Sequence, residues 1–210
     1  MFHGENAAIR SQAHSALAMT ALIAGLLLFL GLHSTRIFAE GFRQRQVARM
    51  GLNGWKAVYS IVSLVGFVLI VWGYGQARLN PVLIWEPPRG LRHVSVLFTL
   101  AAFVLLVAAY VPRNQIKARL HHPMVLAVKV WAFAHLLANG MLADVLLFGS
   151  FLVWSIVLFA VSRRRDRREG IVYPRGTLAG TAITVGVGTA VWLLFLFKLH
   201  VWLIGVSPLG

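Results

Sequence analysis

Long runs of apolar residues alternate along this chain with short segments that carry most of its charge. A run of roughly 20 apolar residues can cross the hydrocarbon of a bilayer as a helix, in which every backbone polar group finds a partner. Runs of this character comprise residues 16–37, 57–77, 94–111, 121–140, 144–162 and 178–204. We therefore predict an all-α fold, a polytopic membrane helical bundle of about six transmembrane helices.

The two ends of the first apolar run decide the predicted domain organisation. Residues 1–15 are polar and show no apolar period, so we expect a disordered N-terminal tail. The run itself is interpreted as a retained helix and not as a signal peptide, because Arg36 lies between the apolar core and any small-residue cleavage site near Ala39. No later hydrophilic stretch is long enough for a second domain. Residues 16–210 are thus expected to form a single transmembrane helical domain.

Composition supports the membrane interpretation. Hydrophobic residues make up 59% of the chain and charged residues only 12%, against about 25% charged in soluble domains. The net charge of +14 would suggest nucleic acid in a soluble protein, but the Lys and Arg lie in short blocks between the apolar runs, without interleaved aromatic residues. We expect the partner of this charge to be the lipid bilayer and no nucleic acid.

The orientation of the chain in the membrane follows from the same blocks of Lys and Arg. The first, third and fifth connections between the predicted spans hold far more Lys and Arg than the other connections. The positive-inside rule places these connections in the cytoplasm and both termini outside it.

The segment of residues 121–140, HHPMVLAVKVWAFAHLLANG, has the most unusual polar content. Pro123 suits the first position of a helix, and Gly140 suits the left-handed residue that closes one. Between them lie Lys129 and His135. An ionisable side chain within a membrane helix is costly, so it normally faces the protein interior and has a function.

One face of this predicted helix forms the wall of a candidate site. His135 and Asn139 are four residues apart and share a face, with Trp131 and Ala132 one turn earlier. We expect Lys129 and Asn139 to lie near whatever His135 binds.

Histidines supply the candidate metal ligands, because the chain has no cysteine. His33 lies in GLHSTR near the inner end of the first span, with Arg36 three residues later on the same face. Two imidazoles from facing helices can hold a b-type haem, with Arg36 and Lys129 as partners for the propionates. Helix counting puts His33 nearer the cytoplasmic face than His135, so His122 is an alternative ligand. A single buried histidine can also serve only helix packing.

Four motifs extend this picture. GLHSTR, HHP, WAFAHLLANG and LFGSFLVW resemble the NnrU family of bacterial membrane proteins, over almost the whole chain from Met19 onward. The family is associated with nitrite and nitric oxide reduction, that is, with denitrification. The resemblance implies a bacterial inner membrane protein with periplasmic termini, linked to the membrane-bound nitrite or nitric oxide reduction machinery.

The family is in turn similar to the plant zeta-carotene isomerase, a haem-dependent cis–trans isomerase. This resemblance implies b-type haem with His33 and His135 as the two ligands. The isomerase has a cysteine three residues before the second ligand, where this chain has Ala132. An exchange of histidine for cysteine at the iron therefore cannot operate here.

Several functions stay open on the sequence alone. A haem protein of this kind could transfer electrons, sense a diatomic gas or isomerise an apolar polyene. HHP before an apolar helix also resembles membrane methyltransferases, but these carry an acidic pair near the C-terminus, and no Asp or Glu follows Glu169 here. A non-catalytic accessory subunit is the remaining alternative.

Overall fold

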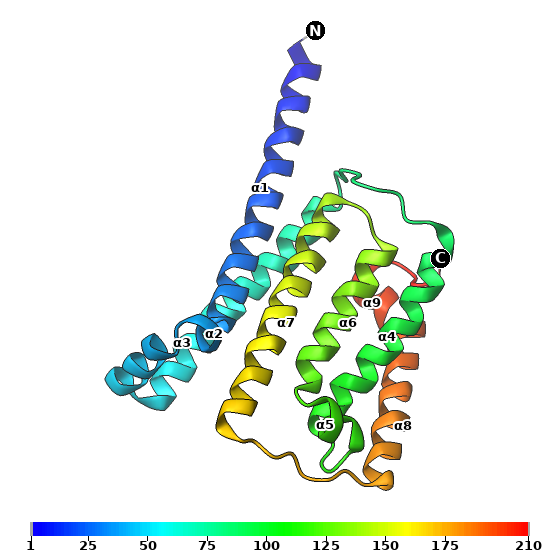
Figure 1. The fold of residues 1–210 in the computed structure, drawn as a ribbon. Coiled ribbons are helices and arrows are strands. Elements are labelled where there is room, and N and C mark those ends of the chain that lie inside the picture. The colour runs from blue at the N-terminus through cyan, green and yellow to red at the C-terminus, as the bar shows by residue number, and fades with distance from the viewer. Residues whose placement is uncertain (1, 210) are drawn as a thin grey trace. The chain divides into compact units, whose positions relative to one another are not determined.

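The computed structural model describes residues 2–209, except for the side chains of residues 2–11 and 36. The regular elements of this part of the chain are helices, which confirms the all-α prediction (Figure 1). They are α1 (Phe2–His33), α2 (Thr35–Phe38), α3 (Glu40–Ala77), α4 (Arg89–Tyr110), α5 (Gln115–Leu120), α6 (Pro123–Ala138), α7 (Leu142–Glu169), α8 (Leu178–Leu194), the π-helical turn η1 (Phe195–Leu199) and α9 (His200–Ile204).

Five helical segments are long and apolar enough to cross a membrane, so the chain is a multi-pass membrane protein. They are Gln12–His33, Glu40–Ala77, Arg89–Tyr110, Leu142–Glu169 and Leu178–Ile204. The predicted span at residues 121–140 is the exception, because α6 has only 16 residues. At 1.5 Å per residue it is about 24 Å long, less than the roughly 30 Å of the hydrocarbon core.

The helices extend beyond the apolar runs at several ends. α1 begins at Phe2, so it includes residues 2–15, where the sequence favoured a disordered tail. An apolar helix that has already formed can propagate into a polar segment, because each further residue adds a hydrogen bond without a new nucleation cost. In the same way α7 continues through the basic run as far as Glu169. α3 begins at Glu40 and bends at Gly51, whose φ of 75° is left-handed.

Two compact units divide the chain. Unit 1 comprises Met1–Ile84 and Met141–Ser150, and unit 2 comprises Trp85–Gly140 and Phe151–Gly210. Each unit is described by itself below, and the single domain of residues 16–210 stays a prediction.

Unit 1 is built on the close packing of α1 against α3. Three glycines bring the two backbones together. A Cβ at Gly73 would lie 2.5 Å from the backbone nitrogen of Leu22, and one at Gly66 would lie 2.9 Å from that of Phe29. Gly25 faces the α3 backbone in the same way. Small residues that let backbones approach are the usual means of helix association in lipid, where burial of apolar surface gives little drive.

Unit 2 packs α4 against both α6 and α8. Gly188 of α8 allows a close approach, since a Cβ there would lie 2.8 Å from the Cα of Val104. Polar side chains also join the helices of this unit, as in the 3.2 Å hydrogen bond that Trp192 Nε1 donates to Thr99 Oγ1. Unit 2 therefore combines small residues with buried polar bonds.

The end of α6 corrects one sequence prediction. The helix closes at Asn139, which is extended with φ −130° and ψ 137°, and Gly140 is not among the glycines with positive φ. Gly140 is instead required by space, because a Cβ there would collide with the carbonyl group of Trp85. The backbone nitrogen of Trp85 donates a 3.2 Å hydrogen bond to the Gly140 oxygen.

Candidate functional site

Two side chains of α6, those of Lys129 and Trp131, contact the part of α7 that belongs to unit 2. The Trp131 ring meets the Phe151 ring edge-on at 5.7 Å between centroids. The ammonium of Lys129 lies 5.8 Å from the centre of the Phe159 ring, a cation–π distance. The polar wall predicted for His135 and Asn139 stays a prediction.

His135 is oriented by its own helix. Its Nδ1 lies 2.8 Å from the backbone oxygen of Trp131, and its ring lies 5.0 Å from the Trp131 ring. A carbonyl oxygen can only accept, so Nδ1 carries the hydrogen and the neutral imidazole keeps its lone pair on Nε2. This is the arrangement that fixes the tautomer and orientation of metal-binding histidines.

Asn139 has a more local role than the sequence indicated. Its side-chain nitrogen donates a 2.8 Å hydrogen bond to the backbone oxygen of His135. It therefore caps the last turn of α6. Ala132, one turn before His135, is fully buried.

His33, the last residue of α1, repeats the geometry of His135 in unit 1. Its Nδ1 lies 2.7 Å from the backbone oxygen of Phe29, again with only a carbonyl to accept the hydrogen. The imidazole stacks on the Phe29 ring at 4.2 Å and 27°, and the Tyr59 ring of α3 lies 5.2 Å away. Aromatic rings on two helices thus hold the His33 imidazole.

The remaining predicted residues divide between the two units. Arg36 lies in α2, and its side chain is outside the part of the chain that the structure describes. Lys129 lies two turns after His122 on α6 and contacts Phe159, as given above. His33 and His135 belong to different units.

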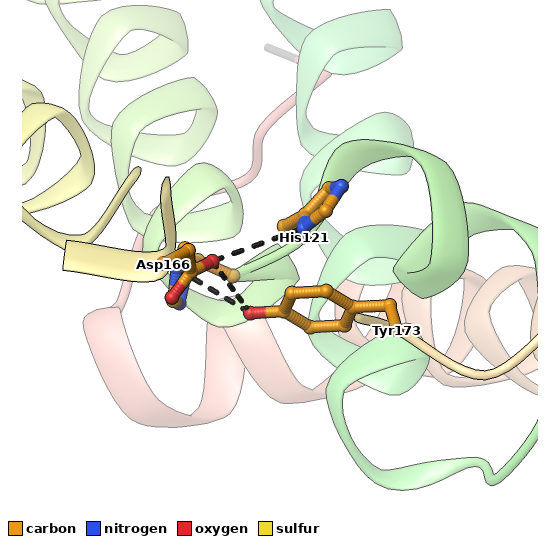
Figure 2. A network of polar contacts seen from close by, with 4 residues as sticks. His121, Asp166 and Tyr173 are labelled. Atoms are coloured by element: carbon orange, nitrogen blue, oxygen red, sulfur yellow. Dashed lines mark hydrogen bonds and ion pairs between the residues drawn. The ribbon is translucent and has the colours of Figure 1, made fainter. Parts of the chain in front are cut away.

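A polar cluster at the corner before α6 was largely missed by sequence reasoning. Asp166, near the end of α7, accepts hydrogen bonds on one oxygen, Oδ2, from Tyr173 Oη and His122 Nε2, each at 2.9 Å. Nδ1 of His121 lies 3.8 Å from the same oxygen (Figure 2). The alternative ligand His122 therefore has its Nε2 engaged by a carboxylate.

The backbone of this corner is strained. His121 has φ 58° and ψ −178°, and His122 has φ 20° and ψ 50°. Left-handed conformations cost a non-glycine residue on the order of 1–3 kcal/mol and persist where the surroundings impose them. Here the hydrogen bond of His122 to Asp166 and the contact of the His121 ring with the Tyr173 ring, at 4.0 Å between centroids, supply these surroundings. The sequence offered one signal, a lone aspartate within a run of arginines.

The pKa values of the cluster reflect its packing. Burial, followed by the hydrogen bond to Asp166, raises the pKa of Tyr173 to about 12. Burial and the charge of Arg163 hold the pKa of His121 below its usual value, against the opposing effect of Asp166. The phenol is therefore a neutral donor and His121 is mainly neutral at pH 7.

Within residues 2–209, no group of three or more His, Asp or Glu is placed to hold a metal ion. A haem iron needs fewer side-chain ligands, because the macrocycle supplies four nitrogens and the protein supplies only the remaining one or two ligands. His33 and His135 both have the tautomer and aromatic surroundings that suit this task. Each histidine, taken within its own unit, therefore has a ring orientation that suits an iron ligand, whereas the described residues hold no group of three or more metal-binding side chains.

Comparison with known proteins gives one match. The family model described as NnrU protein matches residues 21–208, which is nearly the whole chain. No curated protein and no solved structure matches the chain.

Proposed function

Because the chain belongs to the NnrU family, we propose that it is a haem-binding membrane protein that supports nitrite or nitric oxide reduction. The proposed ligands of a b-type haem are the imidazoles of His33 and His135. The proposed location is the bacterial inner membrane, with both termini in the periplasm and with membrane-bound nitrite or nitric oxide reductases as partners.

One observation carries the haem proposal. Both histidines donate Nδ1–H to the carbonyl oxygen four residues earlier in their own helix, at 2.7 and 2.8 Å. Such a bond fixes the tautomer and the orientation of the ring, as the hydrogen bond at the other ring nitrogen does for metal-binding histidines. The same hydrogen bond occurs at two histidines on separate helices, and a b-type haem can take two histidines as its protein ligands.

The neighbouring residues are suited to hold the group and to exclude water. Phe29, Tyr59 and Trp131 place aromatic rings against the two imidazoles. We assign Lys129 and Arg36 to the propionates, since ammonium and guanidinium groups bind carboxylates strongly. Haem bound in this way would supply one-electron redox chemistry or a site for a diatomic gas.

The test is an absorption spectrum of the protein purified in detergent from haem-replete cells. Wild-type protein should show a low-spin b-type spectrum. His33→Gly and His135→Gly should each lose the low-spin form, and added imidazole should restore it by occupying the vacated position. His93→Gly is the matched control, because His93 is an exposed histidine at the start of α4.

Colourless wild-type protein, or a spectrum unchanged in both ligand variants, would overturn the haem proposal and leave the accessory subunit. Turnover of a cis polyene by the loaded protein would favour the isomerase instead. That reaction would have to proceed without the cysteine exchange, because Ala132 is buried and the chain has no cysteine.

A further inference from the structure

An amphipathic surface lies at one end of unit 2, where α5, the end of α7 and the segment of residues 170–178 come together. We call it the corner surface. Three hydrogen bonds hold the segments of the corner surface together. Thr177 N donates to the Arg113 oxygen at 2.7 Å, Ile171 N donates to the Asp166 oxygen at 2.9 Å, and the Tyr173 hydroxyl binds the Asp166 side chain. These bonds hold the segment that connects α7 to α8 (Figure 1) at residues 171, 173 and 177.

Exposed positive charge dominates the corner surface. Its exposed arginines are Arg113, Arg119, Arg164, Arg167, Arg168 and Arg175. Two acidic residues lie in the same segments. Glu169 is exposed, whereas Asp166 turns its carboxylate toward His122 and Tyr173. Because Asp166 is used internally, it does not neutralise the outward-facing arginines of α7.

Large apolar side chains are exposed among these arginines. Val172 is 89% exposed, Leu178 is 79% exposed, and Ile171 and Leu120 are each nearly half exposed. Tyr173 follows Val172 in the sequence, and its hydroxyl points inward to Asp166. This bond holds the neighbouring Ile171 and Val172 at the surface. A surface that meets only water would not normally combine apolar side chains with this density of cations.

The position of the corner surface in the membrane explains the combination. It lies where two membrane-spanning segments end, since one span finishes at Glu169 and the next begins at Leu178. At this depth phosphate headgroups meet the top of the acyl chains. Arginine binds phosphate through two parallel hydrogen bonds, and apolar residues beside it can enter the acyl boundary.

We propose that the corner surface binds the headgroups of anionic phospholipids, with the exposed arginines on the phosphates and Val172 and Leu178 among the upper acyl carbons. The lipid is recognised by its negative charge together with its acyl chains. A free phosphate ion would satisfy only the arginines. The proposal does not depend on haem binding.

The absence of cysteine makes a local probe simple. Val172→Cys would carry the only thiol, to which an environment-sensitive fluorophore is attached. The labelled protein is placed in nanodiscs of phosphatidylcholine alone or with increasing phosphatidylglycerol. The emission should shift to the blue as phosphatidylglycerol is added, and phosphatidylglycerol should be retained over phosphatidylcholine when the protein is extracted and its lipids are counted.

Arg164→Gln, Arg167→Gln and Arg168→Gln combined should remove most of this lipid dependence. Each arginine near an anionic surface contributes roughly a fivefold preference at low salt. The matched control is Arg45→Gln, Arg49→Gln and Lys56→Gln, which removes the same charge from exposed positions on α3 in unit 1. The control should leave the emission at residue 172 unchanged.

Three outcomes would overturn the proposal. Emission that is equal in the two lipids would show no preference for anionic headgroups. An equal loss of lipid dependence in the control variant would show a general effect of net charge. A full response of detergent-solubilised protein to inorganic phosphate alone would show a site for free anions.

Discussion

Units 1 and 2 use different means to hold helices together in an apolar solvent. In unit 1 the backbones of α1 and α3 touch at Gly25, Gly66 and Gly73, so the packing needs few polar side chains. In unit 2 hydrogen bonds join segments far apart in the sequence, as between His122 and Asp166 and between Gln115 and Thr181. The comparison teaches that close backbone approach and polar bonds contribute in different proportions to helix packing where lipid removes the hydrophobic drive.

The same contrast appears in the two aspartates of α7, which both accept a tyrosine hydroxyl. Asp144, at the N-terminal end, accepts from Tyr74 at 2.6 Å on one oxygen and from the Met141 nitrogen at 3.1 Å on the other. The positive end of the helix dipole favours its charge. Asp166 lies at the opposite end, where the dipole disfavours a carboxylate, and hydrogen bonds from His122 and Tyr173 compensate.

The largest expected effect is the loss of unit 1 in Gly73→Leu. The added side chain would meet the Leu22 nitrogen and the Ala18 oxygen, and backbone atoms cannot move aside as side chains do. We expect a cost above about 3 kcal/mol and little monodisperse protein. Size-exclusion chromatography and thermal unfolding in detergent would measure it. Gly75→Leu is the control, because nothing lies within 4 Å of a Cβ there, and equal behaviour of the two variants would contradict this packing.

The next largest effect belongs to the polar corner of unit 2. Asn114 is 1% exposed, donates to the oxygens of Ala108 and Val111, and accepts from the Lys117 nitrogen. Asn114→Ala leaves these backbone groups without their partner, and we expect a loss of about 2–3 kcal/mol. Thermal unfolding measures the loss. Asn80→Ala, at an exposed turn, should cost almost nothing.

Replacing either aspartate of α7 with asparagine should reduce stability by a smaller amount, and the two losses should differ in size. Asp144→Asn should cost about 1–2 kcal/mol, because the amide can accept only one of the two hydrogen bonds and the dipole interaction is lost. Asp166→Asn should cost less, about 0.5–1 kcal/mol, since its donors share one oxygen that the amide retains. Unfolding of both variants under one condition provides the comparison. The reverse order would show that the charge of Asp166 matters more than its geometry.

The smallest effect is a pH dependence of the corner. The pKa of Tyr173 is raised to about 12, so the fold favours the neutral phenol. The stabilisation is complete below pH 10, the ordinary pKa, and is lost as the pH rises from 10 through about 12. Ultraviolet titration of wild-type protein minus Tyr173→Phe isolates this group. In the Asp166→Asn background its midpoint should fall, and an unchanged midpoint would contradict the role of the carboxylate.

Much of the fold could be predicted from the chain alone. Apolar runs long enough for a bilayer leave helices as the main solution, because unpaired backbone groups are too costly in lipid. The predicted final span, residues 178–204, coincides with Leu178–Ile204, and the family resemblance is confirmed over residues 21–208. The helix ends were less predictable. Gly140 was expected as a left-handed cap and is instead a point of close approach to Trp85.

His33 and His135 were selected from the sequence because an ionisable group is costly in a lipid environment, whatever the fold. The sequence likewise determined that no thiolate can take part. Only the tertiary structure decided that Asp166 binds His122 and Tyr173, from segments 44 and 7 residues away. It also decided that Gly73 lies against Leu22. Local spacing shows which residues share a face of one helix, but which faces meet depends on packing between helices distant in the chain.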